Sequence, residues 1–96
     1  MTIHITSDAL RDLEEGFWFY EQQALGLGSY FRSCLLADIE SLAYNGGIHG
    51  LVHGFHRALS KRFPFCIYYS LDVDDLTVVA VLDARRDPLW TRQRLG

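Results

Sequence analysis

The residues 61–71, KRFPFCIYYSL, decide the fold of this chain. After the proline, apolar residues stand at every second position from Phe65 to Leu71, which is the period of a β-strand with one buried face. An aspartate-rich turn, DVDD, follows, and the apolar run LTVVAVLD at 76–83 is typical of a central strand covered on both faces. Because this turn is too short for a crossover helix, we expect the two strands to be antiparallel.

Two helices are expected in the first half of the chain. The first begins at a cap formed by Ser7 or Asp8, because apolar residues then recur at every third or fourth position. The second runs from about 30 to 44, after the break GLGS at 26–29, in which Ser29 is a candidate cap. The expected buried positions are Leu10, Leu13, Phe17, Tyr20 and Ala24 in the first helix and Phe31, Leu35, Ile39 and Leu42 in the second.

The remaining elements complete an α+β domain. TIHIT at 2–6 and FHRALS at 55–60 predict two further strands, and Asp87 followed by Pro88 predicts a short final helix. We therefore expect a short N-terminal strand, an antiparallel two-helix hairpin packed on a small, mainly antiparallel sheet, and a short C-terminal helix. With 96 residues, 49% of them hydrophobic, the chain is expected to form a single domain over 1–96.

The net charge of −3 is unevenly distributed. Residues 1–48 hold seven acidic and two basic side chains, whereas residues 49–96 hold seven basic and five acidic ones. An anionic partner is therefore expected to meet the second half, although the acidic total argues against strong non-specific binding to nucleic acid. No segment has the length and apolarity of a membrane span or the form of a secretion signal, so we expect a cytoplasmic protein with no membrane partner.

Two residue types that often carry chemistry have simpler interpretations here. Cys34 and Cys66 lie among apolar neighbours, where free buried thiols are expected rather than a disulfide. His49, His53 and His56 are spaced as metal ligands on a helix would be, but the glycines between them weaken a helix and no cysteine or carboxylate completes the set. We expect a loop entering a strand, and no metal site.

Basic residues before the central strand have two interpretations. Arg57, Lys61 and Arg62 form either a patch that binds an acidic peptide or phosphate, or a solvated edge whose charges deter strand pairing. Strand alternation allows Arg57 to face outward only if Leu59 does so too, unless a bulge intervenes.

A second basic pair follows the central strand. Arg85 and Arg86 are either a recognition point or part of an internal ion pair with Asp87. Trp90 is expected to cover the core, with stacking on a nucleobase as the alternative.

Sequence motifs for enzymatic chemistry are absent. The chain contains no glycine-rich phosphate loop, no cysteine–histidine metal quartet and no serine nucleophile motif. In the aromatic run FWFY at 17–20, the helical register explains Phe17 and Tyr20 by core packing rather than by a cofactor, whereas Trp18 and Phe19 widen the apolar surface of the helix beyond one stripe. We expect no cofactor and no catalytic residue; any catalysis would rest on arginine, lysine, histidine or tyrosine acting on a phosphodiester.

Three stretches in order carry a resemblance to a known family. They are ALRDLEEGFWFYEQQALGLGSYF at 9–31, ALSKRFPFCIYYSL at 58–71 and LTVVAVLDARRDPLW at 76–90. The sequence resembles the RelE/ParE superfamily of type II toxin–antitoxin toxins, some of which act in plasmid stabilisation. The resemblance implies a cytoplasmic toxin that is neutralised by the C-terminal segment of a cognate antitoxin, possible toxin–antitoxin hetero-oligomers, and no cofactor.

The resemblance implies one of two molecular targets. Some members cleave mRNA on the ribosome, and these often have an arginine near the position of Phe65 and histidine or tyrosine near the C-terminus, which this chain lacks. That departure favours the ParE-like branch, which inhibits DNA gyrase without cutting nucleic acid. The alternatives are a ribosome-dependent endoribonuclease that holds phosphate with Arg57, Lys61 and Arg85, and an inactive antitoxin-binding remnant. For the favoured branch the expected partner contacts are Arg57, Lys61, Arg62, Arg85, Arg86 and Trp90.

Overall fold

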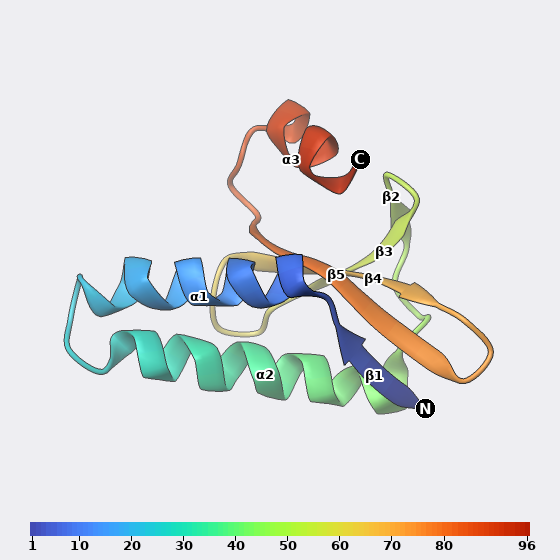
Figure 1. Cartoon of the computed structure of the whole chain (residues 1–96), viewed down its shortest axis with the longest axis horizontal. Coiled ribbons are helices and arrows are strands. Elements are labelled where there is room, and N and C mark those ends of the chain that lie inside the picture. The colour runs from blue at the N-terminus through green and yellow to red at the C-terminus, as the bar shows by residue number, and fades with distance from the viewer.

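A computed structural model describes all residues, 1–96, as three helices and a five-stranded sheet (Figure 1). The sheet order is β1-β5-β4-β3-β2, in which β1 is parallel to β5 and the other neighbours are antiparallel. This arrangement confirms the predicted α+β class and the antiparallel pairing of the last two strands. The elements are β1 (Thr2–Ile5), α1 (Ser7–Glu21), α2 (Leu27–Asn45), β2 (Leu51–Val52), β3 (Phe55–Leu59), β4 (Phe65–Leu71), β5 (Asp75–Asp83) and α3 (Pro88–Leu95).

The sheet has an apolar cluster on each face. The hairpin of α1 and α2 covers one face and α3 lies on the other (Figure 1). Along β4, Phe65, Ile67 and Tyr69 point into the core beneath the hairpin, as predicted, whereas Cys66 and Tyr68 point into a smaller cluster that Trp90 and Leu95 of α3 partly cover. None of the helices combines the length and apolarity needed to span a bilayer.

The buried face of the first helix is shifted from the predicted one. Leu13 and Tyr20 are buried as predicted, together with Ala9 and Gly16, whereas Phe17 is only half-buried and Leu10 is 53% exposed. Gly16 is buried because the Phe31 ring of α2 fills the space beside it, and a Cβ on Gly16 would lie only 2.5 Å from that ring. The predicted caps and one predicted core position are also wrong: the side chain of Thr6 accepts the Ala9 N–H at 3.1 Å, and Ala24 lies beyond the end of α1 and is exposed.

The connection between the helices is held by one carboxylate. Glu21 accepts the backbone N–H groups of Gly26, at 3.0 Å, and Gly28, at 2.9 Å, and so satisfies amides at the start of α2. Ser29 was predicted to cap this helix, but it lies inside α2, whose N-cap is Gly26 with φ 88°. A Cβ on Gly28 would approach the Phe17 carbonyl oxygen to 2.4 Å, so the two helices depend on glycine here.

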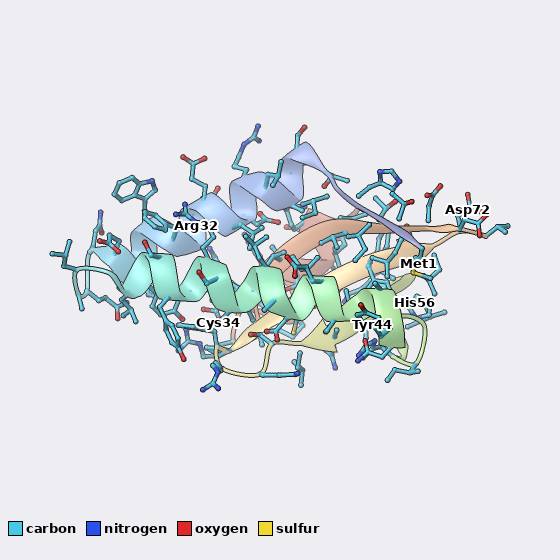
Figure 2. All side chains as sticks on the ribbon, turned by 90° about the horizontal axis from the view of Figure 1, so that it is seen from below. Met1, Arg32, Cys34, Tyr44, His56 and Asp72 are labelled. Carbon is cyan, nitrogen blue, oxygen red and sulfur yellow. The ribbon has the colours of Figure 1, made fainter.

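The second helix confirms the predicted buried face. Phe31, Leu35, Ile39 and Leu42 are all at most 2% exposed. Figure 2, in which α2 lies in front of the sheet, shows Cys34 and Tyr44 on this helix. Cys34 is half-buried and Cys66 buried, and both thiols are free, in line with the sequence prediction.

Candidate partner-binding surface

The structure separates the predicted site residues into different places. Lys61 and Arg62, in the loop between β3 and β4, border a cavity of about 280 Å³ against α2. Asp38 of α2 fixes the start of this loop, because its carboxylate accepts the Ser60 hydroxyl at 2.7 Å and the Lys61 N–H at 3.2 Å. These two basic side chains therefore lie apart from the other predicted contacts.

Arg57 lies on the face of the sheet opposite the hairpin. Ala58 is buried in the main core, so strand alternation turns Arg57 and Leu59 outward together, and Leu59 is 67% exposed. Arg57 and Arg86 border a cavity of about 310 Å³ that also meets His53 and Tyr68. The structure thus brings together Arg57 of β3 and Arg86 of the segment between β5 and α3, which are distant in sequence.

The side chains beneath this cavity are poor proton acceptors. Burial raises the pKa of the Tyr68 hydroxyl and of the Cys66 thiol, and the nearby Arg57 only partly opposes this effect. Both groups therefore remain protonated at neutral pH. Phe65 points to the opposite face and packs against Phe31 at a ring-centroid distance of 4.9 Å.

Arg85 forms an ion pair within the chain. Its Nη2 and Nε atoms donate to the two carboxylate oxygens of Asp83 at 2.7 and 3.0 Å. These hydrogen bonds lower the pKa of Asp83. The sequence suggested Asp87 both as the ion-pair partner and as the cap of the final helix. The cap is confirmed, because the Asp87 carboxylate accepts the Leu89 N–H at 3.1 Å, but the ion-pair partner of Arg85 is Asp83.

Arg86 forms no ion pair, although its charge helps to lower the pKa of Asp83 after the contribution of Arg85, and it stacks on Trp90. The guanidinium carbon lies 4.0 Å from the indole centroid, which is a cation–π contact. Trp90 is half-buried against the cluster that contains Tyr68, in agreement with its predicted place over the core. One face of the indole is consequently occupied by the guanidinium.

A cavity between α1 and α3 was not predicted from the sequence. It measures about 390 Å³ and is bordered by Glu15 and Phe19 of α1 and by Arg86 and Trp90. Phe19 is 54% exposed. The sequence placed Phe17 and Tyr20 of the FWFY run in the core, and the signal for this cavity was that Trp18 and Phe19 widen the apolar surface of the helix.

An anchored C-terminal helix forms one wall of this cavity. The Arg94 Nη2 atom donates to the Asp12 carboxylate at 2.6 Å, and the same carboxylate accepts the Val81 N–H at 3.0 Å. Burial raises the pKa of Asp12, while Val81 and Arg94 act in the opposite direction. The contact joins α3, α1 and β5.

A second groove lies on the hairpin between α1 and α2. It measures about 370 Å³, is bordered by Leu10, Phe17, Trp18 and Leu36, and is open to solvent at Trp18, which is 54% exposed. Arg32 of α2 lies 4.5 Å from the Phe17 ring centroid. The groove combines apolar walls with charged margins, the composition of a protein-binding surface.

The three histidines of the predicted loop do not converge. His49 Nδ1 lies 2.6 Å from the Tyr69 hydroxyl, and His56 Nδ1 lies 2.7 Å from the His49 carbonyl oxygen. His53 lies in the turn after β2, a short strand that the sequence analysis missed. The structure contains no group of three histidine, cysteine, aspartate or glutamate side chains placed to hold a metal ion.

Comparisons with known proteins show that this architecture also occurs in a solved structure. No protein-family model matches the sequence, and no curated protein matches it. Among solved structures, the chain is similar to a chain of the "Chromosomal ParDE TA system from P. aeruginosa", with a TM-score of 0.74 and 17% sequence identity. The match covers 86% of this chain and 95% of the other. The chain therefore has the α+β fold found in that ParDE system.

Proposed function

We propose that this chain is the toxin of a type II toxin–antitoxin system, that it is ParE-like, and that it inhibits DNA gyrase. The observation that carries the proposal is the fold shared with the ParDE chain over nearly the full length of both. The three sequence stretches that resemble RelE/ParE toxins also support it, because they cover most of α1, the start of α2 and both central strands.

A cognate antitoxin is the proposed neutralising partner, acting in the cytoplasm. The exposed Leu10, Trp18 and Phe19 support this part of the proposal, since a partner helix or strand would remove them from water. Toxin and antitoxin would then form a hetero-oligomer. The proposed contacts with antitoxin or target are Arg57, Lys61, Arg62, Arg85, Arg86 and Trp90.

Gyrase is proposed over mRNA because the residues expected from the sequence to hold the phosphate lie apart. Metal-free phosphodiester cleavage needs several charged groups around the reacting phosphate. Lys61 borders a different cavity from Arg57, and Arg85 is paired with Asp83. The three residues suggested for holding phosphate are thus not gathered.

Ribosome-dependent mRNA cleavage is the second candidate function. The observation in its favour is the cavity of about 310 Å³ that brings Arg57 and Arg86 together with His53 and Tyr68. Two arginines would hold a phosphate there, and His53 is exposed and would be the proton-transfer group. In this candidate, Tyr68 would remain a protonated hydrogen-bond donor.

Two assays with purified protein separate the candidates. The chain is added to gyrase during plasmid supercoiling, and separately to ribosomes paused on a defined message, whose ends are mapped by primer extension. The proposal predicts loss of supercoiling and an intact message. Message cleavage that is lost in Arg57→Ala/Arg86→Ala, but retained in the exposed control Arg92→Ala, would replace it with the second candidate. No effect in either assay, with antitoxin binding retained, would indicate an inactive antitoxin-binding remnant.

A further inference from the structure

The cavity between α1 and α3 has an unpaired charge of each sign on its margins. Glu15 borders it from α1, is exposed, and its carboxylate forms no hydrogen bond or ion pair within the chain. Arg86 borders it from the segment between β5 and α3 and likewise has no carboxylate partner. The rings of Phe19 and Trp90 border the same cavity, so the surface combines two opposite charges with an apolar part.

The other charged groups at this cavity are already neutralised. Asp12 is paired with Arg94 at 2.6 Å, and Asp83 is paired with Arg85 at 2.7 Å. A ligand in the cavity would therefore meet Glu15 as the unpaired carboxylate. The repulsion between Glu15 and Asp12 also contributes to the raised pKa of Asp12, after burial, so a cation beside Glu15 would relieve an existing unfavourable interaction.

Arg86 is prepared to bind a carboxylate. The indole of Trp90 covers one face of its guanidinium at 4.0 Å and restricts its orientation. Stacking leaves the N–H groups at the edge of the guanidinium available, and these match the two oxygens of a carboxylate. Since the side chain is held in place before binding, less conformational entropy is lost when the complex forms.

The apolar part of the cavity suits a side chain rather than a solvated ion. Phe19 is 54% exposed, and Phe65 and Val81 also border the space. A volume of about 390 Å³ lies within the range of ligand-binding pockets and exceeds the needs of one water or small ion.

From this charge complementarity we propose that the cavity between α1 and α3 binds a segment of the antitoxin in which an apolar side chain lies between a basic and an acidic one. The basic residue pairs with Glu15, the apolar side chain contacts Phe19 and Trp90, and the acidic residue pairs with Arg86. The inference rests on the proposed function for the presence of an antitoxin, and it adds the chemistry of the segment that this chain selects.

The test uses the full chain and the full-length proposed antitoxin, which is the protein encoded by the reading frame next to the gene of this chain. Affinity is measured by calorimetry for the wild type, Glu15→Lys and Arg86→Glu. Matched controls with the same charge changes are Glu40→Lys on α2 and Arg92→Glu on α3, which are exposed and border neither of these cavities. Thermal unfolding of each variant checks folding; Glu15→Gln and Arg86→Gln replace any charge-reversed variant that does not fold.

We expect Glu15→Lys and Arg86→Glu each to weaken binding by about tenfold or more, with less loss at high salt, and both controls to bind as the wild type does. Wild-type binding that neither variant changes would overturn the inference and leave the proposed function intact. Equal weakening by the controls would also overturn it, because that would reflect overall charge rather than this cavity. No binding of the wild type would instead contradict the proposed function.

Discussion

Replacing Arg94 by methionine tests how the C-terminal helix is anchored. Methionine retains much of the apolar stem but removes the guanidinium from the Asp12 carboxylate, whose side chain is 10% exposed. Removing one partner of a fully buried pair costs about 3–5 kcal/mol. Because the Arg94 side chain is 24% exposed and the Val81 N–H still binds Asp12, we expect a loss of about 2 kcal/mol in the free energy of unfolding near pH 7.

The pH dependence of this loss has a definite sign. Burial raises the folded-state pKa of Asp12 above its ordinary 3.8, so the folded protein binds this proton more tightly than the unfolded chain does. As the pH rises from 3.8 through the higher pKa of the folded state, Asp12 therefore lowers the free energy of unfolding. Without Arg94 that pKa rises further, so the penalty of Arg94→Met should be smaller at about pH 4 than at about pH 7.

Urea unfolding followed by tryptophan fluorescence measures both effects. A loss of about 2 kcal/mol moves the midpoint by about 1 M or more at neutral pH. Asp12→Asn combined with Arg94→Met serves as the control, since the amide oxygen still accepts the Val81 N–H without a buried charge, and it should be more stable than Arg94→Met alone. A midpoint equal to that of the wild type, or the same shift at both pH values, would refute the reasoning.

Two further substitutions test local packing. Gly28→Ala places a Cβ 2.4 Å from the Phe17 carbonyl oxygen and should cost about 3 kcal/mol in thermal unfolding, whereas Gly50→Ala, with no atom within 4 Å, should change stability little. Equal effects would contradict this packing. Tyr69→Phe keeps the ring but removes the hydroxyl that lies 2.6 Å from His49 Nδ1, and should cost about 1–3 kcal/mol in urea unfolding; an unchanged midpoint would show that the hydroxyl stabilises nothing.

Much of the fold followed from local periodicity. The strands β4 and β5 and the helix α2 were predicted because each carries a long, regular apolar pattern. The buried face of α1 was predicted only in part, with Leu13 and Tyr20 correct, because Gly16 has no side chain and gains its burial only from the Phe31 ring of α2. The strand β2 was missed because two residues are too few to show a period, and its pairing with β3 supplies its structure.

The candidate site was predicted less completely than the fold. Residue type and position identified Arg86 and Trp90 as candidate contacts, but their stacking depends on the path of the segment between β5 and α3. The pairing of Arg85 with Asp83, and the separation of Lys61 from Arg57, are set by turns whose geometry the local sequence does not specify. The contribution of α1 through Glu15 requires the three-dimensional arrangement of helices from both ends of the chain.

Growth of a bacterial host after induction of this chain shows whether the chain is a toxin. We expect induction to arrest growth, and co-expression of the proposed antitoxin, the product of the adjacent reading frame, to restore growth through a complex that purifies with both chains. Normal growth on induction of folded protein, together with no complex, would contradict the account.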